Sequence, residues 1–92
     1  MNNIENFFKS KVVNRNGILL YSKKDAIEFV RMSKKLNVRL LGIDGFFLTE
    51  TTIQPSMRDS IDFSKEAGLE IYELALGFLE ERPNNLFFEI VY

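Results

Sequence analysis

The chain has 92 residues, of which 46% are hydrophobic and 27% charged, a balance that fits one folded domain over residues 1–92 and excludes a disordered chain. It has no cysteine and no histidine, which excludes disulfides, thiolate chemistry and the commonest general base and transition-metal ligand. We find no signal-peptide pattern and no apolar run near the roughly 20 residues of a membrane span. We therefore expect a cytoplasmic protein that binds neither a membrane nor a cofactor.

The net charge of −1 conceals an uneven distribution along the chain. Residues 1–40 hold nine basic and three acidic residues, whereas residues 41–92 hold three basic and ten acidic ones. Such a division favours charge-steered association with another protein. It does not favour nucleic-acid binding, which needs a basic surface carrying aromatic side chains, because most aromatic residues lie in the acidic half. The alternative is one basic and one acidic helix, both facing solvent.

The first elements in chain order are short. Residues 1–16 are expected to form an N-terminal helix or an extended arm. The Asn-Arg-Asn-Gly sequence at residues 14–17 indicates a turn, and the apolar residues 18–21 that follow it predict a buried strand.

A first helix is predicted over Lys23–Leu36. Ser22 has the residue type of an N-cap, with Asp25 in the capping-box position three residues later. Apolar residues recur at helical spacing along one face. Asn37 is suited to the left-handed conformation that ends many helices.

The middle of the chain predicts three extended segments. Residues 38–43 are expected to form a central strand that resumes at 46–48, with Asp44-Gly45 between them as a hairpin or bulge signal. Residues 53–55 end in a proline and indicate an edge strand or a loop. Residues 59–64 alternate between polar and apolar, as in a half-exposed strand.

A strongly apolar second helix is predicted over residues 69–81 and a terminal strand over 86–92. Together the elements predict an α+β fold: a mainly antiparallel sheet of four to five strands, with two main helices packed on one face.

Four carboxylates fall within residues 44–62, close to aromatic and amide side chains. Carboxylates surrounding aromatic anchors are suited to a basic protein surface. The candidate partner-binding residues are Asp44, Phe46, Phe47, Glu50, Gln54, Asp59 and Asp62. The alternative is that Asp44 and Asp59 cap local turns and that the phenylalanines belong to the core.

Paired carboxylates are the one enzymatic option that this composition leaves. The four acids could act as a general acid and base or bind Mg²⁺. A chain of this size has little volume for a deep pocket, so we expect no enzyme and no metal site. A carboxylate-based hydrolase stays open as an alternative.

The sequence Leu40-Leu41-Gly42-Ile43-Asp44-Gly45 resembles the small immunity proteins that protect bacteria from tRNA-cleaving colicins. The order of helix, strand, aromatic segment, helix and strand is also similar. The chain departs from that pattern after Gly45, where it has Phe46-Phe47 and no Trp or His, and before Ser22, where it has an additional segment. Only Asp44 matches a motif position.

This resemblance implies an antitoxin-like immunity protein. Members of that group bind the nuclease domain of a toxin one to one and cover its RNA-binding cleft, and immunity proteins of this size also occur in polymorphic-toxin and contact-dependent inhibition systems. The expected partner is then a cognate toxin with a basic nuclease domain. The other alternative is a non-catalytic scaffold or homodimer, joined through the 69–81 helix or the 86–92 edge; the chain itself is expected to be a monomer or a homodimer.

Overall fold

The computed structural model describes residues 4–92 of the chain. A short 3₁₀ segment, Ile4–Phe8, comes first. The strands and helices that follow, in chain order, are β1 (Val13–Arg15), β2 (Ile18–Ser22), α1 (Lys23–Leu36), β3 (Gly42–Leu48), β4 (Ile53–Asp62), α2 (Glu70–Glu80) and β5 (Phe87–Val91). None of the described helices is long and apolar enough to cross a membrane.

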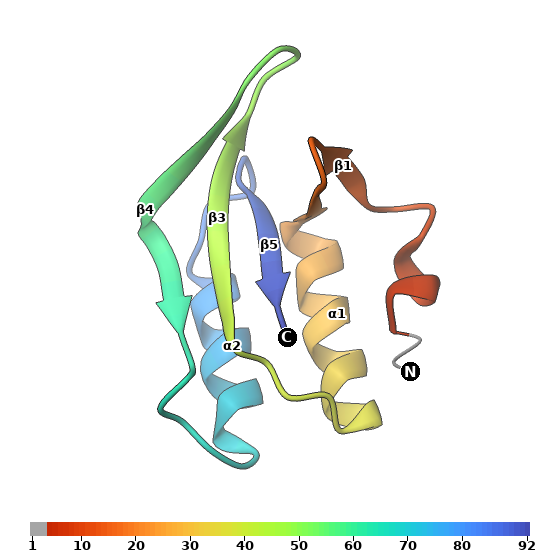
Figure 1. The fold of residues 1–92 in the computed structure, drawn as a ribbon. Coiled ribbons are helices and arrows are strands. Elements are labelled where there is room, and N and C mark those ends of the chain that lie inside the picture. Colours follow the sequence, from red (N-terminus) through yellow and green to blue (C-terminus); the bar gives the residue numbers. More distant parts are fainter. Residues whose placement is uncertain (1–3) are drawn as a thin grey trace.

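The strands form one five-stranded sheet in the order β1-β2-β5-β3-β4, and all neighbours are antiparallel. The last strand therefore lies in the middle of the sheet (Figure 1). Since β2 and β3 are both antiparallel to β5, they run in the same direction and need the long crossover that α1 provides. By the same reasoning α2 joins β4 to β5. The predicted α+β fold with an antiparallel sheet is confirmed.

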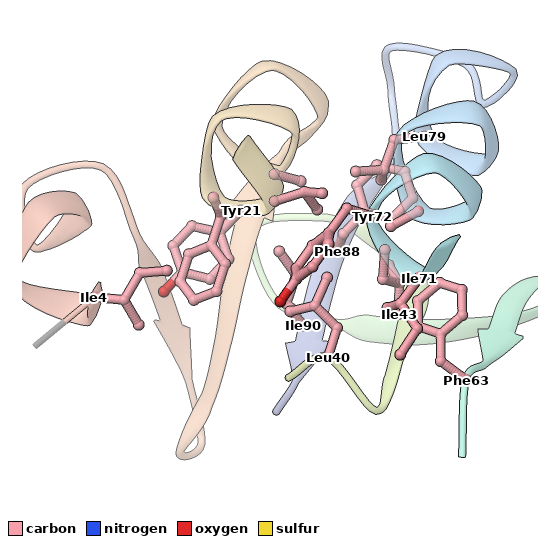
Figure 2. Close-up of a cluster of buried hydrophobic side chains, with 14 of the residues drawn as sticks. Ile4, Tyr21, Leu40, Ile43, Phe63, Ile71, Tyr72, Leu79, Phe88 and Ile90 are labelled. Carbon is pink, nitrogen blue, oxygen red and sulfur yellow. The ribbon is translucent and has the colours of Figure 1, made fainter. Parts of the chain in front are cut away.

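Both helices pack on the same face of the sheet. Tyr21 of β2 and Phe88 of β5 are direct cross-strand partners, so their side chains share one face. The Tyr21 ring lies 5.0 Å from that of Phe29 in α1, and the Phe88 ring lies 6.5 Å from that of Phe78 in α2. The two helices also contact each other. Figure 2 shows side chains from the strands and the helices meeting in this core.

The helix α1 begins and ends where its sequence predicts. The Ser22 hydroxyl accepts a hydrogen bond from the Asp25 backbone N–H at 3.3 Å, which satisfies one of the free N–H groups of the first turn. Asn37 ends the helix with a φ of 59° and donates its backbone N–H to the Lys34 carbonyl. The apolar face, which includes Phe29, is buried.

The predicted turn at residues 14–17 joins two strands. Asn16 and Gly17 have φ values of 54° and 87°, the pair of positive values that a tight two-residue hairpin requires. The N-terminal segment is predicted as a helix or an extended arm. The structure has a short 3₁₀ helix at Ile4–Phe8 and then the strand β1 immediately before the turn. Residues 1–3 of the expected N-terminal segment lie outside the described residues.

The central strand begins later than predicted, at Gly42 instead of residue 38. The polar groups of Val38 are already engaged, because its N–H donates to the Ser33 carbonyl at 2.8 Å and its carbonyl accepts from the Tyr72 hydroxyl at 2.6 Å. They are not available for a strand ladder. The predicted second helix and terminal strand are confirmed within one residue at each end.

The predicted irregularity at Asp44-Gly45 is a bulge. Asp44 pairs with Ser60, but Gly45 pairs with Ser56, so residues 57–59 of β4 have no partner on β3. The segment predicted at 53–55 and most of the segment predicted at 59–64 belong to this one strand, which ends at Asp62. Strand β4 lies at the edge of the sheet, which is where a strand tolerates a proline such as Pro55.

Candidate functional site

The face of the sheet opposite the helices carries three carboxylates. Ile43 and Ile90 form a cross-strand pair that is buried against the helices, so the neighbouring residues on each strand face the other way. Asp44 is directly opposite Glu89 on β5, and Gly42 is opposite Asp62 on β4. We call Asp44, Asp62 and Glu89 the acidic face.

Within the described residues the acidic face has no cation in salt-bridge contact, although Lys65 lies near enough to Asp62 to act on its charge. None of its carboxylates is in a salt bridge with a described lysine or arginine. Asp44 accepts a hydrogen bond from the Ser60 hydroxyl, and Asp62 accepts one from the Ser64 backbone N–H at 2.7 Å. The hydrogen bonds from Ser64 lower the pKa of Asp62, which keeps that group charged.

The pKa of Glu89 is shifted in the opposite direction from that of Asp62. Partial burial raises the pKa of Glu89, and the facing Asp44 carboxylate raises it further. Both effects act against the charged form. Like charges that are directly opposite on neighbouring strands are destabilising, so this pair lowers the stability of the isolated chain.

Asp59 is not part of the acidic face. Its carboxylate accepts a hydrogen bond from the Ser56 hydroxyl at 2.6 Å and forms an ion pair with the Arg82 guanidinium at 3.3 Å. Asp59 is 8% exposed. The pair joins the bulge of β4 to the end of α2, and the sequence-based role of Asp59 in partner binding is replaced by this internal one.

Arg82 is held from several sides. Its guanidinium lies 4.6 Å from the ring centre of Phe78, and its backbone carbonyl accepts a hydrogen bond from Lys23 Nζ at 2.8 Å. Its Nε is buried and makes no hydrogen bond within the described residues. The guanidinium forms two ion pairs: one with the buried Asp59 carboxylate, and a longer one, at 3.5 Å, with the exposed Glu81 carboxylate. Asp59 is the buried partner, which makes the Asp59–Arg82 pair a structural element of the fold.

No protein-family model, curated protein or solved structure matches this chain. The chemistry of the site therefore rests on its own geometry.

The remaining candidate residues lie around the β3–β4 hairpin, whose tip projects beyond the helices (Figure 1). Phe47 and Gln54 are cross-strand partners and are both exposed. They share a face with Gly45, which is the face opposite that of Asp44. Glu50 is exposed in the loop at the tip.

Phe46 belongs to the same sheet face as Asp44 but is buried. It pairs with Phe87 on one side and Pro55 on the other, and it is 8% exposed. This burial suits a support for the acidic face better than a direct contact. The seven sequence-predicted residues are therefore divided between the acidic face, the hairpin tip and the interior.

The four carboxylates proposed for an acid–base or Mg²⁺ site do not converge. Within residues 4–92, no group of three or more acidic, histidine or cysteine side chains is arranged to hold a metal ion. Asp59 faces Arg82, while Glu50 is at the hairpin tip. The four carboxylates therefore do not form one site.

Sequence reasoning did not include Glu89 among the candidates. The alternation of residues 86–92 indicates that Glu89 faces one side of a strand, but it does not give the neighbouring strand. Only the position of β5 between β2 and β3 brings Glu89 opposite Asp44.

Proposed function

We propose that this chain is a non-catalytic cytoplasmic inhibitor that binds a basic surface on a bacterial toxin nuclease. The observation that carries the proposal is the opposition of Asp44 and Glu89 on an uncovered sheet face without a bonded cation in the described residues. A lysine or arginine from a partner would remove their mutual repulsion.

The surroundings of the acidic face support binding to a protein. Leu41 and Val91 are 39% and 38% exposed, and the Leu41 N–H donates to the Val91 carbonyl, so they lie together beside Gly42. Protein interfaces combine such apolar contacts with a polar rim. The charged groups would contribute association rate and specificity more than affinity.

A nuclease is the favoured class of partner for two reasons. A surface that binds a nucleic-acid backbone has clustered lysine and arginine side chains, which complement closely spaced carboxylates. The Leu40–Gly45 sequence that resembles the colicin immunity proteins also contains Asp44 of the acidic face. The proposed inhibitor thus covers the RNA-binding cleft of its toxin.

The test asks whether a gene that neighbours the one for this chain encodes a toxin that the chain binds. Co-expression of the chain should protect cells from the toxin, and the purified proteins should form a one-to-one complex whose association slows as the salt concentration rises. The variant Asp44→Asn/Glu89→Gln should fold but bind more weakly. If no neighbouring gene product binds, the proposal is contradicted.

A matched control separates a local effect from net charge. Glu70→Gln/Glu73→Gln removes the same number of charges from exposed positions at the start of α2. It should leave toxin binding nearly unchanged. Equal loss of binding in both double variants would show that the acidic face has no special role.

The homodimer alternative has one observation in its favour. Leu69 and Leu74, at the start of α2 and within it, are 65% and 43% exposed. Exposed apolar side chains on one helix can form a contact between copies. Sedimentation at several protein concentrations would detect a salt-insensitive dimer, and Leu74→Glu should dissociate it if α2 forms the interface.

A further inference from the structure

A cleft opens between β2 and β5 because these strands separate soon after they meet. Their pairing consists of Ser22 with Phe87 and Tyr21 with Phe88, whereas β3 and β5 pair over five residues. The resulting space has a volume of about 380 Å³, at the small end of the range for ligand-binding clefts. Its lining includes Glu5, Leu19, Tyr21, Glu89, Ile90 and Tyr92.

Tyr21 presents an unused polar group to this cleft. The residue is only 3% exposed, and its ring packs against Phe8 and Phe29. Its hydroxyl makes no hydrogen bond to any of residues 4–92, and Figure 2 shows the hydroxyl pointing away from the helices, toward the side of Ile4. The hydroxyl is not among the buried, unpartnered polar atoms of residues 4–92, so it is accessible although the side chain as a whole is buried. It can therefore bond to an occupant of the cleft.

The charge of the lining determines what this occupant can be. Glu5 and Glu89 line the cleft, and no lysine or arginine among residues 4–92 does. The Tyr92 hydroxyl donates to the Glu5 carboxylate, which positions that carboxylate at one side. Leu19 and Ile90 supply apolar walls. These surroundings favour a cation on an apolar stem and disfavour an anion.

We propose that the cleft between β2 and β5 binds a guanidinium or ammonium group carried on an apolar stem, and that an arginine or lysine side chain of the partner is its occupant. The preference for a cation follows from the residues that line the cleft. The assignment of that cation to a side chain of the toxin rests on the proposed function. The occupant's N–H groups donate to the two carboxylates and to the Tyr21 oxygen. Its stem lies against Leu19 and Ile90.

The two tyrosine side chains of the cleft also favour a cation as its occupant. Tyr92 is 37% exposed and can place its ring against a planar guanidinium, which stacks on aromatic faces. Burial, followed by the Glu5 carboxylate, raises the pKa of Tyr21 to about 12. Its hydroxyl is therefore neutral near physiological pH and is able to accept a hydrogen bond from the cation.

The test measures binding of N-butylguanidinium, with N-butylurea as a neutral probe of nearly the same shape. NMR titration of the full chain should give saturable shifts at Leu19, Ile90 and Val91 with the cation and none with the urea. Tyr21→Phe should weaken binding of the cation by roughly tenfold, since it removes one hydrogen bond to a charged group. Equal shifts from the two probes, or no saturation, would overturn the proposal.

Tyr72→Phe is the matched control. It removes a hydroxyl that donates to the Val38 carbonyl outside the cleft, and it should leave binding of the cation unchanged. Because the Tyr21 hydroxyl has no partner in residues 4–92, Tyr21→Phe should remain folded. If it binds N-butylguanidinium as the parent chain does, Tyr21 is not part of a cation site and the proposal is wrong.

A further pair of measurements separates this inference from the proposed function. Asp62→Asn alters the acidic face but not the cleft lining, so it should weaken toxin binding and leave N-butylguanidinium binding intact. If the toxin binds but Tyr21→Phe does not weaken the complex, the partner's side chain does not occupy the cleft. If N-butylguanidinium binds and no toxin does, the cation site stands and the proposed function fails.

Discussion

Asp44 and Glu89 face each other directly across β3 and β5, on the side of the sheet that the helices leave uncovered. Both belong to the interior of the sheet and not to a flexible loop, so neither backbone can move away to relieve the repulsion. The repulsion between the two carboxylates can then be reduced only by solvent or by a cation from a binding partner. This fixed opposition links the stability of the isolated chain to its proposed binding.

The first prediction follows from that opposition. Asp44→Asn or Glu89→Gln should raise the free energy of unfolding by about 0.5 kcal/mol, because each removes one of two like charges on a cross-strand pair. Urea unfolding near neutral pH measures the change. Glu70→Gln, on an exposed turn of α2, should have almost no effect. A loss of stability in both acidic-face variants would contradict the inferred repulsion.

The second prediction concerns pH. The pKa of Glu89 is raised above its ordinary value of 4.5 by burial and then by Asp44. The folded state therefore favours the protonated form, and the stability that this contributes is complete below pH 4.5 and lost as the pH rises through the raised pKa. Glu89→Gln should be more stable than the parent above that window and equally stable below it. Urea midpoints across the window check this, and a gain independent of pH would contradict it.

The third prediction concerns the ion pair between Asp59 and Arg82. Asp59→Ala should lower the free energy of unfolding by about 2 kcal/mol, because it removes the buried carboxylate and leaves a largely buried guanidinium with only the exposed Glu81 as an ion-pair partner among the described residues. Arg82→Met in the same chain should recover part of the loss, since the buried guanidinium that lost its buried carboxylate is then gone. A double-mutant cycle gives the coupling between the two residues. Additive losses would show that the pair is not coupled.

The fourth prediction compares two tyrosines. Tyr72→Phe should lower the free energy of unfolding by about 1 kcal/mol, because the Val38 carbonyl loses its donor. Tyr21→Phe should cause no loss, because its hydroxyl has no partner among residues 4–92. Thermal or urea unfolding of the two variants makes the comparison. A similar loss in both would contradict the difference inferred from the hydrogen bonds.

The fifth prediction compares two glycines. A Cβ at Gly45 would lie 2.8 Å from the Asp59 carbonyl oxygen, so Gly45→Ala should destabilise the chain by about 2 kcal/mol. A Cβ at Gly77 meets nothing within 4 Å, and Gly77→Ala should stabilise α2 by up to about 1 kcal/mol. Unfolding measurements should give changes of opposite sign in the free energy of unfolding for the two variants, and changes of the same sign would contradict the prediction.

The elements that the sequence predicted well depend on neighbouring residues. Helix α1 depends on the Ser22 cap and the Asn37 stop, and the first hairpin depends on Asn16 and Gly17, all within a few residues of the element they define. Such local signals are visible in a single sequence. The late start of β3 could not be predicted from the sequence, because the hydrogen bond from Tyr72 to Val38 joins residues 34 positions apart.

The candidate site was predicted less well for the same physical reason. Asp44 and Asp62 were identified, and both lie on the acidic face. The internal role of Asp59 depends on Arg82, which is 23 positions away, and the role of Glu89 depends on the strand order. Charge and alternation along the chain contain no information about which distant residue will be the neighbour.

The central position of β5 has a consequence for how the chain folds. Strands β2 and β3 are not paired with each other, and they join one sheet only through β5. During synthesis the hairpin of β1 and β2 and the hairpin of β3 and β4 can form early, but residues 87–91 must emerge before these halves are linked. Because the closing contacts join residues far apart in sequence, we expect slow folding. Until then the inner edges of both halves are open to pairing with other chains.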